Sequence, residues 1–429
     1  MYDLTIIGAG WAGFNAAQTA KKLGLKACLV EKAEIGGTCL NLGCIPTKTL
    51  IQSAKIYSLA KKSPAFGLQN LNPKIDFLKV QERKTKIIQQ LRIGMQSMLK
   101  DIDFLNAEAQ ILSNEEIKAG NQILNTKFIL IATGSKAIEL TAFKFDAKRI
   151  ISSDDILNLK EIPNSLLIIG GGVIGCEFAS LFSTLGTQIT IVEKMPQLLP
   201  GEDREVAKKI ETIFKKKGIK VNINTDATTF DLKDYSLILV CVGRAPETKR
   251  LGLEELGIKL DKGKIVVDEY LKTNIPNIYA AGDCTGKIML AHFAAYQGSI
   301  AAQNIASSDN LKKADNSNIP NCIFTDPEIA SVGLTEEKAK EKGIDININK
   351  FDFLGSGMAR ILDETDGFIK LISDKNTEEI LGGSIIGPRA TELISILTLS
   401  ASCRLKIPEI RNVIFAHPTL SESIHQALE

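Results

Sequence analysis

The sequence predicts an α/β protein with two parallel-sheet domains of similar design and a smaller α+β domain at its C-terminal end. A pattern of apolar strand, GxGxxG turn, helix, strand and acidic residue occurs twice, which is typical of two Rossmann-like domains. The residues after about 309 contain strands and a helix without that pattern. With 429 residues and 44% hydrophobic content, the chain is long enough for two or three domains.

The first repeat unit lies at the start of the chain. A strand from Leu4 to Ile7 precedes the glycine turn, a helix runs through Lys22, and a second strand covers Ala27 to Val30. Glycines let the backbone approach a pyrophosphate, a helix N-terminus attracts its charge, and an acid accepts hydrogen bonds from the ribose. The residues expected to hold a dinucleotide here are Gly8, Gly10, Gly13 and Glu31.

The second unit repeats the first with the same spacing. Its strands are Leu166 to Ile169 and Gln188 to Val192, with a helix through Leu185 between them. Eighteen residues separate the last glycine from the acid in both units. The second set is Gly170, Gly172, Gly175 and Glu193. Glu193 should repel a 2′-phosphate, so this site favours NAD over NADP.

Three further strands end in residues suited to a cofactor. They are Phe128 to Ala132, Leu237 to Val242 and Ile278 to Ala281. The carboxyl ends of parallel strands are where ligands bind in such sheets. The candidate contacts are Ala132, Thr133 and Gly134 after the first of these strands, Gly243 after the second, and Gly282 and Asp283 after the third.

A cysteine pair, Cys39 and Cys44, lies in the run from Gly36 to Lys48, directly after the first unit. A regular helix would hold the two Cα atoms roughly 8–9 Å apart, whereas a disulfide needs no more than about 7 Å. Gly43 and the other glycines of the run permit a distorted turn. A thiol pair beside a cofactor can pass two electrons between a disulfide and a ring. The alternative is two unbonded, buried thiols.

Composition narrows the possible compartments and partners. The net charge is +2 with acids and bases interspersed, and no apolar stretch is long enough to cross a membrane. The chain enters a strand within its first residues, which leaves no room for a signal peptide. We therefore expect a cytoplasmic protein without nucleic-acid or membrane partners and without a metal site. In that reducing compartment a disulfide is more often catalytic than structural.

The remaining six cysteines are interpreted as packing residues because most have apolar or helical surroundings. They are Cys28, Cys176, Cys241, Cys284, Cys322 and Cys403. The C-terminal region is expected to cover the cofactor domains or to form a dimer contact. Its predicted elements are strands at Asn321 to Phe324, Phe368 to Ile372 and Ile380 to Ile386, and a helix from Ala390 to about Cys403.

His417, one of three histidines, opens the segment that ends at Glu422. A thiol site needs a base to form thiolate, neutral imidazole suits that work, and a carboxylate can orient the ring. The alternative is a surface histidine before a helix.

Two charged residues complete the candidate site. Lys48 lies four residues after Cys44, on the same helix face, and Glu177 follows Gly175 by two residues. A Lys–Glu pair beside a cofactor ring could bias its electronics. Otherwise both are ordinary helix residues.

These motifs together resemble the class I pyridine nucleotide-disulfide oxidoreductases, closest to the dihydrolipoamide dehydrogenase branch, from Leu4 to Glu422. The resemblance implies FAD in the first site and NAD in the second. It also implies three parts: an FAD domain of residues 1–148 and 271–308, an NAD domain of 149–270, and an interface or dimerisation domain of 309–429.

The resemblance also implies roles for individual residues. Cys39 would exchange with substrate and Cys44 would contact the flavin, beside a Lys48–Glu177 pair. His417, oriented by Glu422, would act on the thiols of the opposite subunit, so activity would require a homodimer. Further contacts implied are Thr38, Lys48 and Ala291 for FAD and Val173 over the nicotinamide pocket.

The activity implied is oxidation of dihydrolipoyl groups, on carriers of 2-oxoacid dehydrogenase or glycine cleavage complexes, with reduction of NAD through a Cys39–Cys44 disulfide. Two alternatives stay open: a related flavin reductase acting on another disulfide or a metal ion, and a complex-bound flavoprotein with a mainly structural role. The stretch Asn222 to Ser236 is shorter than usual for such chains, which predicts a trimmed hairpin, and only seven residues follow Glu422 to brace His417.

Overall fold

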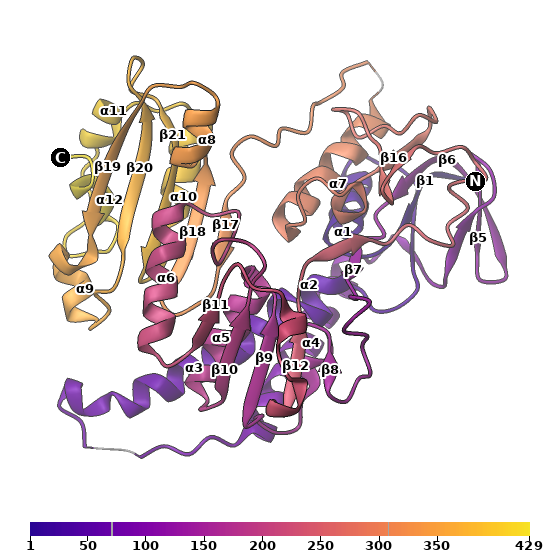
Figure 1. Ribbon diagram of the computed structural model, residues 1–429. Helices are drawn as coiled ribbons and strands as arrows, with labels where there is room; N and C mark the ends of the chain where they lie inside the picture. Colours follow the sequence, from indigo (N-terminus) through magenta and orange to yellow (C-terminus); the bar gives the residue numbers. More distant parts are fainter. Residues whose placement is uncertain (70–71, 308) are drawn as a thin grey trace.

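The computed structural model describes residues 1–69, 72–307 and 309–429. Figure 1 shows two domains built on parallel sheets and an antiparallel C-terminal domain, drawn in orange and yellow, beside the second of them. This is the predicted α/β architecture with a separate α+β domain.

The sheet of the first domain is centred on β1 (Tyr2–Ile7), which pairs in parallel with β2 (Ala27–Glu31) and β6 (Gln122–Ile131). The strands β3 (Asp103–Asn106) and β16 (Ile278–Ala280) extend it, and the hairpin β4 (Ala109–Ile111) and β5 (Glu116–Ala119) is antiparallel. The central strands are buried on both faces, which explains their continuous apolar sequence.

Helices α1 (Trp11–Lys22) and α7 (Ala291–Ala306) cover this sheet and pack closely on each other. A Cβ atom on Gly298 would lie 2.0 Å from the carbonyl oxygen of Ala12, so only glycine fits there. Three more helices, α2 (Gly37–Leu42), α3 (Cys44–Lys61) and α4 (Phe77–Met98), lie in the chain between β2 and β3 of this sheet. They reach the second domain (Figure 1), where Leu50, Ala54 and Phe77 pack in its core.

The second domain has the strand order β11-β10-β9-β12-β8, all parallel. Its strands are β8 (Ile150–Ile151), β9 (Ser165–Ile169), β10 (Gln188–Val192), β11 (Lys220–Asn222) and β12 (Leu237–Val240). Its helices are α5 (Val173–Thr184) and α6 (Arg204–Lys216). Between β11 and β12 the chain forms two single 3₁₀ turns, η3 (Ala227–Thr229) and η4 (Leu232–Asp234), in place of a hairpin. Their apolar residues pack on the sheet.

The chain returns to the first domain earlier than residue 271. Strand β13 (Arg244–Pro246) pairs with β7 (Ser135–Ala137) between the domains, and Leu251, Ile258 and Ile265 already pack in the first core. The expected boundary at 270 is therefore too late, because the short hairpin β14 (Leu260–Asp261) and β15 (Lys264–Ile265) buries its apolar side against the first domain.

The C-terminal boundary also differs from the expected one. Lys312 still hydrogen-bonds to Asn304 of α7, and Ala314 packs against the first core. Ser308, the last residue of the expected FAD domain, lies outside the described residues.

The C-terminal domain is an antiparallel sheet of order β17-β18-β21-β20-β19. Its strands are β17 (Asn321–Ile323), β18 (Glu328–Gly333), β19 (Ile346–Asp352), β20 (Phe368–Asp374) and β21 (Ile380–Gly387), and its helices are α8 (Glu336–Glu341), α9 (Gly357–Ile361), α10 (Ala390–Ser402), α11 (Ile407–Arg411) and α12 (Glu422–Gln426). Ile424 and Leu428 are buried in its core, so the end of the chain holds α12 firmly.

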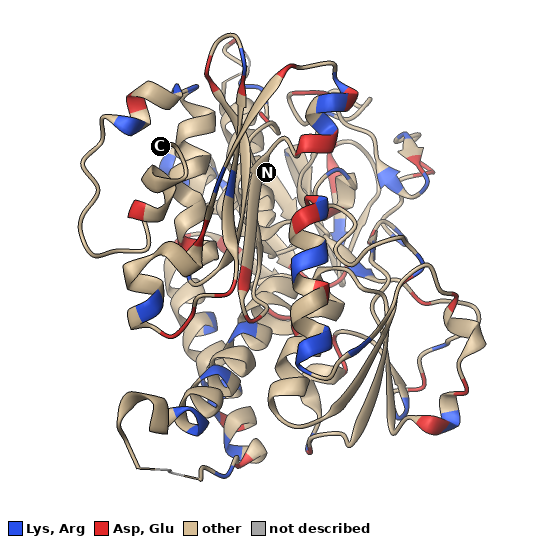
Figure 2. Ribbon diagram, turned by 60° about the vertical axis from the view of Figure 1, so that its left-hand side comes forward, with Lys and Arg blue, Asp and Glu red and all other residues tan. Residues whose placement is uncertain are grey.

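Charge of both signs is spread over the surface elements, as the blue and red segments of α6 and the C-terminal sheet show in Figure 2. Among the described residues, no helix combines the length and apolar character needed to cross a bilayer.

Candidate active site

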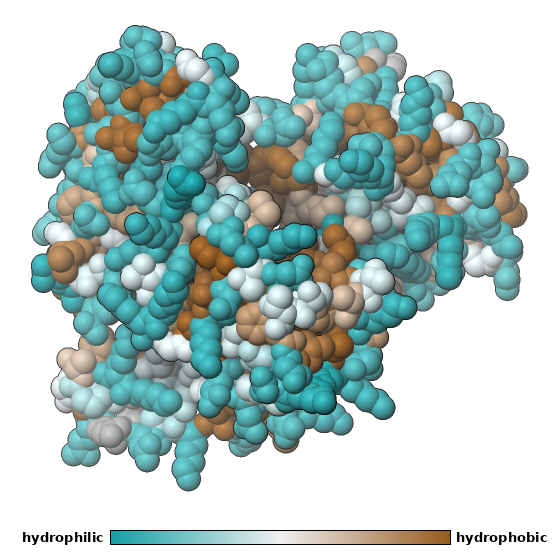
Figure 3. Space-filling model, in the orientation of Figure 1, coloured by the Kyte–Doolittle hydropathy of each residue, from teal (hydrophilic) through white to brown (hydrophobic). Residues whose placement is uncertain are grey.

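A single large cavity of about 1470 Å³ is lined by both glycine turns and by both Cys39 and Cys44. Small-molecule sites usually measure roughly 300–1,000 Å³. A cavity above that range suits more than one ligand. The face of the molecule in Figure 3 is hollowed where the three domains meet.

The first glycine turn is shaped for close approach of a ligand. Gly8 has φ of +104°, and a Cβ atom there would lie 2.4 Å from the carbonyl oxygen of Ala132. A Cβ on Gly13 would lie 1.8 Å from the carbonyl oxygen of Gly8, so the start of α1 rests directly on the turn. Glu31 accepts hydrogen bonds from the backbone N–H groups of Ala9 (2.7 Å) and Ala33 (2.8 Å), which fixes its carboxylate at the turn.

The second turn repeats this construction. Gly170 has φ of +114°, and a Cβ on Gly175 would lie 2.0 Å from the carbonyl oxygen of Gly170. Glu193 accepts from the backbone N–H groups of Gly171 (2.6 Å) and Met195 (2.7 Å). We call each glycine turn together with its acid a dinucleotide cradle: Gly8 to Gly13 with Glu31, and Gly170 to Gly175 with Glu193. The two cradles have the same backbone geometry and the same placement of the acid, which fits two dinucleotides.

The other expected cofactor contacts lie on the same cavity wall. Those lining it are Gly8, Gly10, Thr38, Ala132, Thr133, Gly134, Gly282, Asp283 and Ala291 around the first cradle, and Gly170, Gly172, Val173, Glu193 and Gly243 around the second. Gly13 and Gly175 lie behind the turns as packing positions. Burial raises the pKa of Asp283, whose carboxylate accepts a hydrogen bond from the Ser135 hydroxyl at 2.6 Å.

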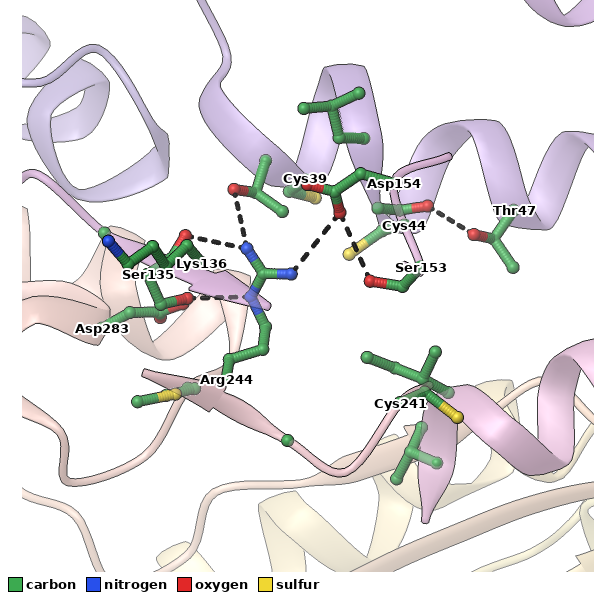
Figure 4. A pocket seen from close by; sticks show the side chains of 18 of the residues that line it. Cys39, Cys44, Thr47, Ser135, Lys136, Ser153, Asp154, Cys241, Arg244 and Asp283 are labelled. Atoms are coloured by element: carbon green, nitrogen blue, oxygen red, sulfur yellow. Dashed lines mark hydrogen bonds and ion pairs between the residues drawn. The ribbon is translucent and has the colours of Figure 1, made fainter. Parts of the chain in front are cut away.

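Arg244 is a site residue that the sequence did not single out. Its guanidinium donates to the hydroxyl and carbonyl oxygens of Ser135 at 2.9 and 2.7 Å, to the Thr38 hydroxyl at 3.4 Å, and lies 3.7 Å from the Asp154 carboxylate. Figure 4 shows it at the centre of this group. Its position directly after Gly243 was the available signal. Arg244 connects both sheet domains to the helix that carries Cys39.

The cysteine pair lies where α2 ends and α3 begins. Gly43, with φ −147° and ψ −111°, interrupts the helix, and Cys44 opens α3. This break brings the Cys39 and Cys44 side chains to the same part of the cavity wall (Figure 4), although a continuous helix would separate them. The Cys39 thiol donates a hydrogen bond to the Cys44 sulfur, which lowers the pKa of Cys44 to about 7 and raises that of Cys39.

Lys48 and Glu177 form an ion pair in the cavity wall. The Lys48 ammonium lies 2.8 Å from both carboxylate oxygens of Glu177, whose side chain is only 4% exposed. Glu177 also accepts from the backbone N–H of Phe324 at 2.9 Å, so the pair joins α3, α5 and the C-terminal domain. After the Cys39 hydrogen bond, the positive charge of Lys48 also lowers the pKa of Cys44.

We expect Lys48→Met to move formation of the Cys44 thiolate to higher pH. The substitution removes a nearby positive charge and leaves the Glu177 carboxylate unpaired, and both changes disfavour a second negative charge. The measurement is the pH dependence of Cys44 alkylation in the reduced protein. Lys55→Met is the matched control, because Lys55 lies on the same helix but contacts Glu328 and Glu364 at 4.0 and 3.9 Å instead. Equal midpoints for Lys48→Met and the native chain would contradict the role of Lys48.

The six other cysteines differ in their surroundings. Cys28, Cys176, Cys241 and Cys284 are buried, and burial raises their pKa values, to about 11 for Cys28 and about 12 for Cys284. Cys322 is half-buried. The packing interpretation is wrong for Cys403, which is exposed because it caps α10 at the surface.

His417 and Glu422 form a pair outside the cavity. The His417 Nδ1 atom lies 3.1 Å from both Glu422 carboxylate oxygens, and the His417 side chain is 81% exposed. Neither residue lines the cavity of its own chain. Large apolar side chains are exposed on the same domain: Leu354, Ile361, Leu399, Val413 and Ile414. Figure 3 shows apolar side chains on the surface of that domain.

Comparisons with known proteins agree with this geometry. Residues 2–298 match the pyridine nucleotide-disulphide oxidoreductase family, and residues 319–428 match the dimerisation domain of the same family, which supports a homodimer.

Similar proteins include the dihydrolipoyl dehydrogenase of Chlamydia muridarum, which is 38% identical over 98% of this chain and 95% of its own length. That of Geobacillus stearothermophilus is 40% identical over 100% of this chain and 95% of its own length. Among solved structures, the HOCl-induced flavoprotein disulfide reductase RclA from Escherichia coli superposes with a TM-score of 0.89 at 31% identity, covering 100% of this chain and 99% of that one.

Both glycine cradles fit dinucleotides, and a contacting thiol pair lies at the cavity that they share. The chain belongs to the pyridine nucleotide-disulphide oxidoreductase family and uses the FAD and NAD(H) of that family.

Proposed function

We propose that this protein oxidises dihydrolipoyl groups and reduces NAD, as a dihydrolipoyl dehydrogenase. The observation that carries the proposal is the contacting Cys39–Cys44 pair on a cavity shared by two dinucleotide cradles. Curated relatives with that name, similar over nearly the full length of both chains, support the choice of substrate. The expected partners are lipoyl-carrying proteins of 2-oxoacid dehydrogenase or glycine cleavage complexes, and the expected location is the cytoplasm.

The proposed exchange starts from the oxidised pair. A substrate thiolate attacks the Cys39 sulfur, the Cys39–Cys44 bond breaks, and Cys44 leaves as a thiolate, which its low pKa favours. The second substrate thiolate then attacks the substrate sulfur of the mixed disulfide, so that the lipoyl S–S bond forms and Cys39 leaves. The two substrate thiol protons pass to the base and to Cys39.

FAD and NAD would supply the two-electron chemistry that returns the thiols to a disulfide, with one hydride on NAD and one proton released. The residues of the chain bind the cofactors and orient the reacting groups. Glu31 and Glu193 lie where ribose hydroxyls are expected, Lys48 keeps positive charge beside Cys44, and Arg244 fixes Thr38 next to Cys39.

The base in this scheme is His417 of the opposite subunit. Its exposed ring cannot serve the thiols of its own chain from outside the cavity, and Glu422 orients the Nδ1 side so that Nε2 faces outward. A two-fold dimer through the C-terminal domain would place each His417 at the other chain's thiols.

His417→Gln is expected to lower turnover about 10²–10⁴-fold, the usual contribution of a general base, without loss of flavin absorbance or of the dimer. Steady-state oxidation of dihydrolipoamide and size-exclusion chromatography measure this. An unchanged rate would remove His417 from the site.

Mixed dimers test the position of the base. Combining His417→Gln chains with Cys44→Ser chains makes one complete site in each mixed dimer, so we expect roughly a quarter of native activity at equal mixing. No recovery in dimers shown to be mixed would contradict a base supplied across the subunits.

The function itself is tested by a substrate panel on the purified holoenzyme. We expect dihydrolipoamide with NAD to be turned over at least about a hundredfold more efficiently than dihydrolipoamide with NADP or glutathione disulfide with NADH. A preference for another disulfide would reject the proposed substrate. Capture of a lipoyl protein without turnover would favour a structural role in a complex.

A second candidate is reduction of another disulfide or of a metal ion. The superposition with RclA favours it, because one solved form of that protein is a Cu(II) complex, with a TM-score of 0.88 at 30% identity. NADH-dependent reduction of Cu(II) that exceeds lipoamide turnover would support this candidate.

A further inference from the structure

The indole nitrogen of Trp11 is a buried donor beside the thiol pair. Trp11 is the first residue of α1, directly after Gly10 of the first glycine turn. Its Nε1 atom is buried and has no hydrogen-bond partner of good geometry among the described residues. Buried indole N–H groups usually find a partner, so an unpartnered one at the wall of a reactive cavity calls for a functional reason.

The backbone brings Trp11 next to Cys39. The starts of α1 and α2 touch, since a Cβ atom on Gly37 would lie 2.7 Å from the Cα of Gly10. Trp11 directly follows Gly10, and Cys39 lies two residues after Gly37. Both Trp11 and Cys39 line the same cavity. The Trp11 ring is held by an edge contact with Phe14, at 6.5 Å between ring centroids. Hydrogen bonding with Cys44 and burial raise the pKa of the Cys39 thiol, and the nearby Trp11 N–H opposes that rise.

The cofactor is a poor alternative acceptor for this N–H group. The Nε1 atom is covered by protein although the cavity beside it is large, so a pyrophosphate over the glycines meets other atoms of the ring first. A thiol or disulfide sulfur accepts hydrogen bonds weakly, whereas a thiolate accepts charge-assisted bonds that are about twice as strong as neutral ones. The donor therefore gains a good partner only when Cys39 carries negative charge.

We propose that the Trp11 indole N–H is a catalytic hydrogen-bond donor that stabilises the Cys39 thiolate. This rests on the proposed exchange at Cys39, but not on the identity of the substrate. In the second exchange the substrate S–S bond forms, the bond from substrate sulfur to Cys39 breaks, and its electron pair stays on Cys39. Trp11 donates to that leaving sulfur until a proton arrives from the His417 base. Within the reduced pair the lower pKa of Cys44 favours the thiolate there, and the Trp11 N–H opposes this by stabilising the thiolate on Cys39.

Trp11→Phe tests the proposal, because it keeps an aromatic ring and removes the N–H. In the reduced holoenzyme, we expect the rate of Cys39 alkylation by iodoacetamide at pH 7 to fall roughly tenfold and its midpoint to move to higher pH, since hydrogen bonds to charged groups are worth at least that factor. Peptide mass spectrometry separates Cys39 from Cys44. Phe14→Leu, which loosens the packing of the ring but keeps the N–H, should leave the Cys39 profile in place.

An unchanged Cys39 profile in Trp11→Phe that still binds FAD would overturn the proposal, and so would an equal shift in Phe14→Leu. Trp11 is the only tryptophan of the chain, so its indole ¹H–¹⁵N resonance is assigned at once and tests the native protein if the variant fails to fold. We expect that resonance to shift on reduction of the holoenzyme, and to shift less in Cys39→Ser. An indole chemical shift that is the same in the oxidised and the reduced holoenzyme would refute the donor role. Neither readout uses a lipoyl substrate, so failure of the proposed function is seen separately.

Discussion

Cys44→Ser is expected to abolish oxidation of dihydrolipoamide, by at least about a thousandfold, while FAD stays bound. Serine cannot form the disulfide that accepts the substrate electrons, and Cys39 alone can only exchange with one substrate sulfur. The cradle residues around Gly8 and Glu31 are untouched, so the visible flavin absorbance should remain. Turnover and the absorbance spectrum of the purified variant are the measurements.

Cys322→Ser is the matched control for that experiment. Cys322 lines the same cavity, but burial raises its thiol pKa to about 11, so it is a poor nucleophile at neutral pH. We expect this variant to keep most of the native rate. Full activity in Cys44→Ser, or an equal loss in Cys322→Ser, would show that the electrons do not pass through the Cys39–Cys44 pair.

Lys370→Met is expected to destabilise the protein by about 3–5 kcal/mol, because it leaves a buried carboxylate without its partner. The Lys370 side chain is 1% exposed and its ammonium lies 3.0 Å from Asp203, which is 0% exposed, and 2.8 Å from Glu336. Asp203 also caps α6 by accepting from the backbone N–H of Glu205 at 2.9 Å. The loss therefore weakens the contact between the second and C-terminal domains and the start of that helix.

Lys350→Met provides the comparison for Lys370. Its ammonium lies 2.7 Å from Glu205, but the side chain is 39% exposed, and exposed pairs contribute about 1 kcal/mol or less. Thermal or urea unfolding of both holoenzyme variants at one protein concentration measures the difference. Equal midpoints for the two variants would mean that the buried Lys370 network does not hold the domains together.

The two cradles could be predicted in detail because their information is local. Glycines at fixed spacing, an apolar strand on either side and an acid at the end of the second strand act within about thirty residues. The structure places these elements within a residue or two of the expected bounds. The trimmed segment of the second domain was visible in the same way, because chain length between two strands can be counted.

The contacts of Arg244 and the point at which the chain returns to the first domain could not be predicted from the sequence. Arg244 joins residues from three distant segments, and its partners are set by the pairing of β13 with β7. The chain returns to the core of the first domain at Leu251, and the short hairpin β14–β15 that follows packs there. The sequence of this hairpin has no strong alternation of apolar and polar residues. Long-range packing decides such contacts, and no local pattern encodes them.

The sequence by itself determined the fold class, the family resemblance and the redox pair, because periodicity, glycine spacing and a CxxxxC run are properties of neighbouring residues. Only the tertiary structure supplied the geometry of the site: the break at Gly43 between α2 and α3, the 2.8 Å Lys48–Glu177 ion pair, the exposed His417 outside the cavity of its own chain, and the buried Trp11 N–H without a partner among the described residues. The physical reason is that each of these depends on how separate elements pack, which fixes distances between residues that the chain order leaves far apart.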